Sequence, residues 1–177
     1  RGMITDRNGK PLAISMPAES IWANPRLFKA TNEQTAQLAL LLKFPKKALQ
    51  QKIAKQKQRE FVYLKRALSL EDASKILALR IPGVFSDRGY KRYYPEADAM
   101  AHVVGFTNID DQGQEGLELA YESWLRGIPG KVRVVKDCLG NTVTNLGVIA
   151  DPQQGNNLML SIDRRVQYLA YHELKKA

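Results

Sequence analysis

The sequence has no long hydrophobic run and almost no cysteine. Its 177 residues contain no stretch approaching the ~20 apolar residues that a membrane-spanning helix requires, and no signal-peptide pattern. The single Cys138 cannot form an internal disulfide. A chain without disulfides fits the cytosol and also an exported protein that folds without them, so cysteine usage leaves the compartment open. Apolar content is ordinary at 44%, which predicts a folded chain rather than a disordered one.

The sequence also lacks the residue patterns of a metal or catalytic centre. His102 and His172 lie far apart, and neither has cysteines or carboxylates at ligand spacing nearby, which argues against a metal site. A packed or capping role is the better interpretation of His102. Cys138 has no identifiable base and orienting group, so we expect an inert thiol. The glycines do not form a phosphate-binding loop, and no cofactor is predicted.

Positive charge is unevenly distributed. The chain has 27 Lys and Arg against 18 Asp and Glu, and the segment 43–66, from Lys43 to Arg66, holds nine of the basic residues against one acid. Such a segment could bind nucleic acid, an anionic membrane surface or an acidic partner, or it could be a solvated helix face. Nucleic acid is not expected, because Phe44, Phe61 and Tyr63 are spaced as core anchors rather than as a base-stacking platform.

The stretch 92–130 organises the chain. A first short helix is predicted after Pro95, carrying Met100 and Val104 and ending at Gly105. A second is predicted over 115–126, with apolar residues at 3- and 4-residue spacing and Gly127 as its end. The residues between them are rich in turn formers. The stretch therefore reads as a rigid connector with several special backbone positions.

The rest of the chain alternates between predicted strands and helices. A hairpin turning at 6–9 opens it, with Leu12, Ile14 and Met16 on one buried face, and a short strand follows at 21–23. Helices are predicted after the capping box Thr31–Gln34, over 45–57, and from Ser69. Further elements are expected as follows: strands at 61–64, 84–94 and 158–162, a hairpin of 131–137 with 141–147 around Leu139–Gly140, and a helix capped by Asp163.

These elements predict an α+β fold: an elongated set of β-hairpins and strands with an inserted, mostly helical lobe. The β-rich parts are 1–30 and 84–162, the helical lobe is 31–83, and 163–177 begin a further helix. Within the connector, Glu115 and Glu118 share a helix side, as paired catalytic carboxylates would. The helix macrodipole explains their position equally well, and a salt bridge to Arg92 or Arg7 is the better expectation.

Three motifs, in order and at characteristic spacing, resemble a known family. Their residues are Arg1, Gly2, Asp6, Arg7 and Gly9; Arg92, Tyr94, Pro95, His102, Gly105 and Phe106; and Gly113, Glu115, Gly116, Glu118, Gly127 and Gly130. The chain resembles the non-catalytic N-terminal module of class B penicillin-binding proteins, of the cell-division type found in Gram-negative bacteria. One departure is Ala97, where the family commonly has glycine.

The resemblance implies a pedestal at the periplasmic face of the bacterial inner membrane. A single membrane span would precede Arg1, and a transpeptidase domain that cross-links septal peptidoglycan would follow the helix at 163–177. That chemistry uses Ser-x-x-Lys, Ser-x-Asn and Lys-Ser/Thr-Gly motifs, none of which occurs here, so this chain is not expected to be an enzyme. Implied partners are divisome proteins, including the septal lipid-II-polymerising glycosyltransferase, the chain's own transpeptidase domain and a possible second copy.

A charge network is predicted to tie the motifs together. Arg7, Arg92, Glu115 and Glu118 come from all three motifs, and charge-assisted pairs hold separated segments in one geometry. The alternative is that these residues lie on a solvated surface, where each contributes little. The competing functional hypothesis is a basic binding module for nucleic acid or an anionic membrane surface, centred on 43–66.

Overall fold

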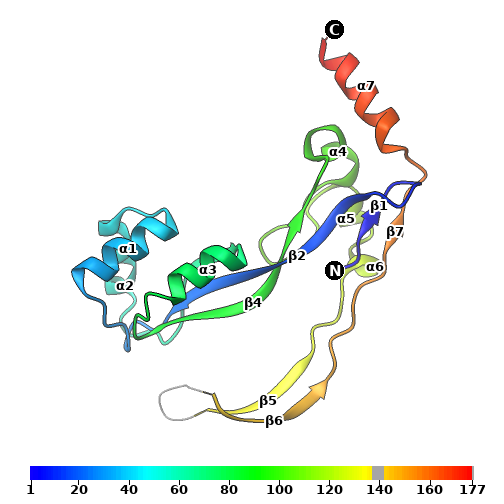
Figure 1. The fold of residues 1–177 in the computed structure, drawn as a ribbon. Coiled ribbons are helices and arrows are strands. Elements are labelled where there is room, and N and C mark those ends of the chain that lie inside the picture. The colour runs from blue at the N-terminus through cyan, green and yellow to red at the C-terminus, as the bar shows by residue number, and fades with distance from the viewer. Residues whose placement is uncertain (137–141, 177) are drawn as a thin grey trace. The chain divides into compact units, whose positions relative to one another are not determined.

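The computed structural model describes residues 1–136 and 142–176, and its chain divides into two compact units (Figure 1). Unit 1 comprises Arg1–Ser15 and Arg92–Ala177, and unit 2 comprises Met16–Lys91. Cys138 and the predicted turn at Leu139–Gly140 lie outside the described residues. The mixture of helices and sheets confirms the predicted α+β class.

Unit 2 packs three helices on a small antiparallel sheet. Its elements, two of which continue into unit 1, are β2 (Pro11–Ala23), α1 (Asn32–Leu42), α2 (Lys46–Lys55), β3 (Val62–Leu68), α3 (Leu70–Leu77) and β4 (Val84–Tyr93). β2 pairs with β3, with Trp22 opposite Tyr63, and β4 also pairs with β2. The strand predicted at 21–23 is therefore the end of one long strand.

Local capping signals start the helices of unit 2 where the sequence predicts. The backbone N–H of Gln34 donates to Thr31 Oγ1 at 3.1 Å, and the backbone N–H of Thr31 donates to Gln34 Oε1 at 3.0 Å. Ser69 caps α3 by accepting from the backbone N–H of Asp72 at 3.1 Å. Pro45 precedes α2 in an extended conformation. Each contact satisfies a donor that a helix start leaves unpaired, which confirms the capping box and the Ser69 helix start.

The core of unit 2 is apolar and well buried. Its members come from β2, β3, all three helices and the connection between α3 and β4: Ile21, Ala23, Leu38, Ala39, Leu42, Leu49, Ile53, Leu64, Leu68, Ala73, Ile76 and Ile81. Phe44, Phe61 and Tyr63 are not among them, so their prediction as core anchors is wrong. Val62 and Leu64 take the inward positions of β3, and strand alternation turns Tyr63 to the other side.

Unit 1 contains short elements around a smaller core. They are β1 (Ile4–Thr5), the start of β2, α4 (Ala97–Val104), α5 (Gly116–Ala120), α6 (Glu122–Leu125), β5 (Lys131–Lys136), β6 (Thr142–Ala150), β7 (Leu158–Met159) and α7 (Arg164–Lys176). β1 pairs antiparallel with β2 and parallel with β7, while β5 and β6 form a separate hairpin. The core consists of Ile4, Leu12, Ala13, Met100, Val104 and Leu125.

Three further predicted features of the chain need correction. The helix predicted over 115–126 is two helices, because Tyr121 takes the non-helical angles φ −109° and ψ 28° between α5 and α6. The strand predicted at 158–162 is shorter in the structure, where β7 covers only Leu158–Met159. Met16 is 49% exposed rather than on the buried face. Ala97 begins α4.

Candidate functional site

A buried cluster of charged side chains joins distant segments of unit 1. Glu118 lies at its centre: Oε2 is 2.7 Å from Arg1 Nε, and Oε1 is 2.8 Å from Arg92 Nε. Arg1 Nη2 also lies 2.6 Å from Glu122 Oε2. The side chains of Arg1, Arg92 and Glu118 are 1%, 2% and 0% exposed, so water does not screen these pairs. We call these four residues the charge junction.

Each member of the charge junction comes from a different local element. Arg1 precedes β1, Arg92 lies on β4, Glu118 lies on α5, and Glu122 opens α6. Tyr121, which separates the two helices, directly precedes Glu122, the second carboxylate that binds Arg1.

Backbone groups and a hydroxyl add further hydrogen bonds, although Arg92 Nη2 and Glu122 Oε1 are buried without a hydrogen-bond partner. Arg1 donates to the carbonyl oxygens of Asp111 and Glu118 at 2.8 and 2.9 Å, and Arg92 donates to Ser15 Oγ at 3.0 Å. The backbone N–H of Gly113 donates to the Glu122 carboxylate at 2.9 Å. Burying a charge is costly unless it is paired and hydrogen-bonded, and these contacts supply most of that compensation.

The electrostatics of the junction favour fixed charges over proton transfer. Burial alone would lower the pKa of Arg1, but hydrogen bonds to Glu122 and Glu118 outweigh it and raise that pKa above its ordinary value. Burial alone would raise the pKa of Glu122, but hydrogen bonds from Arg1 and Gly113 lower it. Glu118 is engaged by two guanidinium groups at once. The cluster is therefore a structural tie, and its carboxylates are not placed to act as general bases.

A second cluster fixes the start of α7. Asp6 Oδ1 accepts from the backbone N–H groups of Asn8 and Lys10, both at 2.8 Å, and Oδ2 accepts from that of Arg164 at 3.3 Å. Asn8 Nδ2 donates to Asp163 Oδ2 at 3.2 Å. Burial acts to raise the pKa of Asp6, yet these hydrogen bonds lower it. The turn after β1 thereby anchors the helix, with Asp163 accepting from the backbone N–H of Arg165 at 3.0 Å as its predicted cap.

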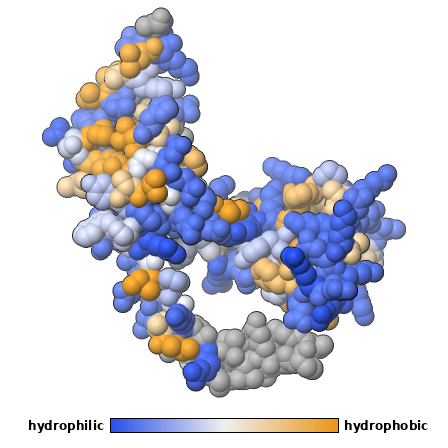
Figure 2. Space-filling model, turned by 180° about the vertical axis from the view of Figure 1, so that it is seen from behind, coloured by the Kyte–Doolittle hydropathy of each residue, from blue (hydrophilic) through white to orange (hydrophobic). Residues whose placement is uncertain are grey.

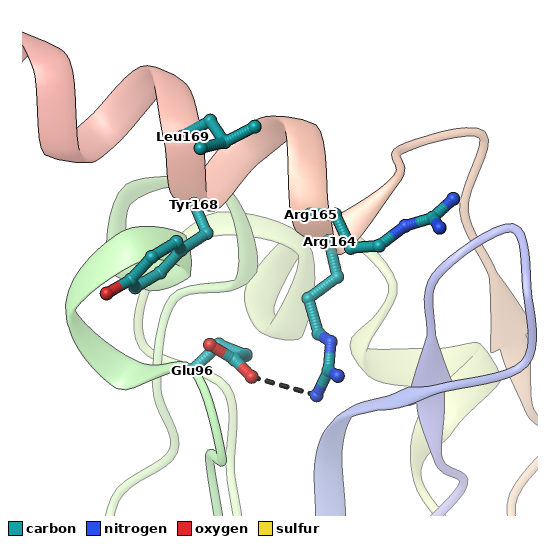
Figure 3. Close-up of a pocket in the computed structure, with 5 residues that line it drawn as sticks. All are labelled: Glu96, Arg164, Arg165, Tyr168 and Leu169. Carbon is teal, nitrogen blue, oxygen red and sulfur yellow. Dashed lines mark hydrogen bonds and ion pairs between the residues drawn. The ribbon is translucent and has the colours of Figure 1, made fainter.

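A shallow pocket of about 430 Å³ lies between α4 and α7. It is lined by Glu96, Arg164, Arg165, Tyr168 and Leu169. Figure 3 shows the Glu96 carboxylate directed at Arg164, and the two side chains form an ion pair of 2.9 Å. The third charged residue of the lining, Arg165, pairs with Asp163 at 2.9 Å, so each charged side chain of the pocket has an ion-pair partner.

The exposed surface of α7 includes several apolar side chains among its charged ones. Val166, Leu169 and Leu174 are 65%, 60% and 78% exposed, and hydrophobic residues gather around this helix in Figure 2. Among the described residues, no helix is both long and apolar enough to cross a bilayer.

Two motif glycines bring backbones into direct contact. Gly105 has φ +75°, and a Cβ there would lie 1.9 Å from the carbonyl oxygen of Glu115. Gly116 has φ +58°, and its Cβ would lie 2.7 Å from the backbone N of Gly105. Both positions therefore exclude larger residues, which explains why the end of α4 and the start of α5 carry glycine. Gly2, Gly113 and Gly127 also lie against neighbouring backbone.

The predicted charge network is half correct. Arg92 and Glu118 pair as expected, but the side chains of Arg7 and Glu115 are exposed and lie outside the charge junction. Their places are taken by Arg1 and Glu122. Glu122 lies four residues after Glu118, but the helix is broken at Tyr121 and Arg1 is far away in the sequence, so no local spacing rule identifies the pair of Arg1 and Glu122.

The remaining motif residues have structural or surface positions. The Tyr94 hydroxyl accepts from the backbone N–H of Thr107 at 2.9 Å, and Gly9 occupies the β1–β2 turn with φ +74°. Three others lie at the surface: Pro95, His102 and Phe106. Gly130 lies against Pro152. His102 is thus not a packed histidine.

The basic segment 43–66 is partly used by unit 2 itself. Lys65 Nζ donates to the carbonyl oxygen of Leu42 at 2.8 Å, near the end of α1. The Lys52 ammonium lies 5.7 Å from the Phe44 ring centroid. Four lysines along α2 and its end, Lys46, Lys47, Lys52 and Lys55, are not fully buried. The segment is a charged helix face together with local contacts.

Comparisons with known proteins identify related sequences. The family described as "Penicillin-binding Protein dimerisation domain" matches residues 1–160. The chain is 42% identical over its whole length to the probable peptidoglycan D,D-transpeptidase PbpC of Pseudomonas aeruginosa. It is 40% identical, again over its whole length, to the peptidoglycan D,D-transpeptidase FtsI of Escherichia coli. It spans 31% of the length of each of these relatives.

A solved structure shares the fold. The chain matches a penicillin-binding protein, PBP2, in a complex with MreC from Helicobacter pylori, with a TM-score of 0.69 and 23% sequence identity. The match covers 99% of this chain and 37% of that one.

Proposed function

This chain belongs to the penicillin-binding protein dimerisation domain family, and we propose that it serves as the pedestal of a septal peptidoglycan D,D-transpeptidase. The domain is the non-catalytic module of these proteins, while the relatives that carry it are named as D,D-transpeptidases. The proposed role is to hold a following catalytic domain at a set position and to contact partner proteins of cell division.

The charge junction is the observation that carries this proposal. It joins Arg1 to Glu118, which are 117 residues apart in the chain, and Asp6 joins the first turn to Arg164, at the start of α7. A pedestal must fix the position of the segment that leaves it relative to the segment that enters it. Buried charge-assisted bonds fix geometry more sharply than apolar contacts do, because they have defined donors and acceptors.

Membership of the family supports a proposal for the cellular location, the neighbouring segments and the partners of the chain. A membrane span before Arg1 would place the module at the periplasmic face of the inner membrane, and α7 would lead into the transpeptidase domain. Residues 31–83 would form a head lobe on a β-rich anchor made of 1–30 and 84–162. Divisome proteins are the proposed partners, including the septal lipid-II-polymerising glycosyltransferase, and a second copy remains a further candidate. The PBP2 relative solved with MreC supports contacts of this kind.

The experiment is to replace Arg92 by Ala in the full-length protein and test it in cells that depend on that gene for division. We expect filamentous cells, because loss of Arg92 leaves Glu118 incompletely paired and loosens the junction. Labelling of the membrane-bound protein by fluorescent penicillin should persist, because the catalytic motifs lie outside this chain. The matched control is Arg88→Ala, an exposed arginine four residues earlier on β4.

Two results would contradict the proposal. Normal division in the Arg92→Ala strain would show that the junction is not needed. Loss of penicillin labelling in Arg92→Ala but not in Arg88→Ala would show that the module supports folding of the catalytic domain rather than its position.

A further inference from the structure

Four aromatic rings form a continuous ladder across the sheet of unit 2. The Trp22 ring of β2 lies 4.7 Å from the Phe61 ring and 4.6 Å from the Phe85 ring, between centroids. Phe61 in turn lies 4.6 Å from Tyr63, edge to face. We call Trp22, Phe61, Tyr63 and Phe85 the aromatic face.

The aromatic face lies on the opposite side of the sheet from the core. Ile21 and Ala23, the neighbours of Trp22 in β2, are both 0% exposed, and Leu64, the neighbour of Tyr63, is 3% exposed. Because strand side chains alternate, the rings project from the other side. Phe61 and Tyr63 remain 41% and 37% exposed, so unit 2 does not cover them with its own helices. Contiguous exposed apolar surface of this kind marks interaction sites.

Unit 2 as a whole is strongly cationic. Unit 2 holds 15 Lys and Arg against 6 Asp and Glu. Its net charge therefore equals the net charge of +9 of the whole chain. A cation also lies at the face itself, where the Arg66 guanidinium is 4.9 Å from the Tyr63 ring centroid. Such a potential attracts anionic partners and disfavours cationic ones.

The ring geometry favours a protein partner over nucleic acid. β3 and β4 both pair with β2, and they bring Phe61 and Phe85 against Trp22 at interplanar angles of 36° and 28°. The indole faces are thus taken by neighbouring rings. Base stacking needs an open ring face. Ring edges and apolar surface are what remain, and these suit side chains such as Leu, Phe or Tyr.

We propose that the aromatic face docks an acidic segment of a partner protein, with apolar or aromatic side chains on the rings and carboxylates attracted by the net positive charge of unit 2. This inference deepens the proposed interaction role and rests on it. Its binding variants lie in unit 2 and change no member of the charge junction, so failure here would leave the role of the charge junction standing.

The test uses Trp22 as the reporter. The chain has two tryptophans, so a Trp124→Phe variant leaves Trp22 as its only indole. The probe is a random copolymer of glutamate and tyrosine, compared with poly-glutamate of the same length, at physiological salt. We expect the copolymer to shield Trp22 from acrylamide quenching and to bind at least about tenfold more tightly than poly-glutamate, because a few buried aromatic contacts dominate such interfaces.

Variants locate the binding. Phe61→Ala and Tyr63→Ala should each weaken copolymer binding about tenfold, a loss typical of an interface hot spot. The matched control is Tyr90→Ala, which removes a 68% exposed tyrosine from β4 of the same unit. Circular dichroism checks that each variant is folded. If one is not, the acrylamide shielding of the Trp124→Phe chain still decides the question without it.

Other outcomes overturn the proposal. If poly-glutamate bound as tightly as the copolymer, the binding would be unspecific charge attraction. The same would follow if Tyr90→Ala weakened copolymer binding as much as Phe61→Ala and Tyr63→Ala do. Equal shielding of Trp22 by oligo(dT) or by phosphatidylglycerol vesicles would show a general polyanion surface instead of a protein-docking face.

Discussion

The two units of this chain hold themselves together in different ways. Unit 2 buries a cluster of twelve apolar residues, eleven of them from two strands and three helices, whereas the apolar cluster of unit 1 has six. Unit 1 instead buries Arg1, Arg92 and Glu118 at its centre. Its charges also balance at 12 Lys and Arg against 12 Asp and Glu, while unit 2 carries all of the net positive charge.

The difference follows from what each unit has to join. The segments of unit 2 are close in sequence and can condense on one another around apolar helix faces. Unit 1 must bring its first residues to elements more than a hundred positions later, with few apolar side chains to do so. Specific ion pairs select one arrangement among many, although desolvation offsets much of their attraction. Unit 1 is therefore expected to be the more sensitive to changes of charge, and unit 2 to changes of volume.

The sharpest test of this contrast is Glu118→Gln. The amide keeps the shape of the side chain but removes the charge shared by two buried guanidinium groups and turns one acceptor into a donor. Breaking a buried pair in this way costs about 3–5 kcal/mol of unfolding free energy. Urea unfolding measures the total, and amide hydrogen exchange should assign the loss to unit 1.

The matched control is Glu60→Gln in unit 2. Glu60 pairs with Arg26 at 2.7 Å, but the two side chains are 71% and 54% exposed. An exposed pair contributes at most about 1 kcal/mol. Similar losses in both variants would show that the charge junction is no stronger than a surface pair.

The converse test is Leu42→Ala in unit 2. Leu42 is fully buried at the end of α1, and removing it leaves a cavity that costs about 2–5 kcal/mol. Leu40→Ala is the control, because Leu40 lies on the same helix and is 77% exposed. Urea unfolding should separate the two variants clearly. If Leu42→Ala lowered hydrogen-exchange protection in unit 1 as much as in unit 2, the two units would unfold as one.

Features that depend on short-range signals could be predicted from the sequence. The capping box at Thr31 and Gln34, the Ser69 cap and the helix end at Gly105 each follow from a few neighbouring residues, and all three are present. The prediction of one long helix over 115–126 is wrong because its apolar spacing continues through Tyr121, and no glycine or proline there marks the break that the structure shows.

The candidate site was predictable only where sequence motifs marked it. Arg92 and Glu118 were paired correctly because both are charged members of the motifs. Choosing between Arg7 and Arg1 required knowing which arginine is buried, and charge alone does not tell this. The same limit explains the aromatic face: Phe61 and Tyr63 are ordinary core residues by composition, and only the register of β3 on β2 turns them outward.

Lowering the pH should destabilise unit 1 before unit 2. The pKa values of Asp6, Glu122 and Asp163 are lowered in the folded chain: that of Asp163 chiefly by hydrogen bonds from Arg165, those of the other two by hydrogen bonds that outweigh burial. A carboxyl with a lowered folded pKa stabilises the fold above its unfolded pKa and loses that contribution as pH falls. All three lie in unit 1, so its hydrogen-exchange protection should fall first below about pH 5.

Asp111 acts in the opposite direction within the same unit. Burial raises its pKa, so its protonation on acidification relieves an unfavourable charge. The net acid effect is therefore smaller than three lowered carboxylates alone would give. Earlier loss of protection in unit 2 than in unit 1 would contradict the assignment of charge-based stability to unit 1.

The smallest expected effect comes from Thr31→Ala, at the start of α1 in unit 2. The substitution removes the hydroxyl that accepts from the backbone N–H of Gln34, and loss of such a cap costs about 1 kcal/mol. Hydrogen exchange of the Gln34 amide should rise first. Thr31→Ser is the control, because serine keeps the hydroxyl and should retain most of the protection. A loss as large as that of Leu42→Ala would mean that unit 2 depends on its caps as much as on its apolar core, and the contrast with unit 1 would then narrow.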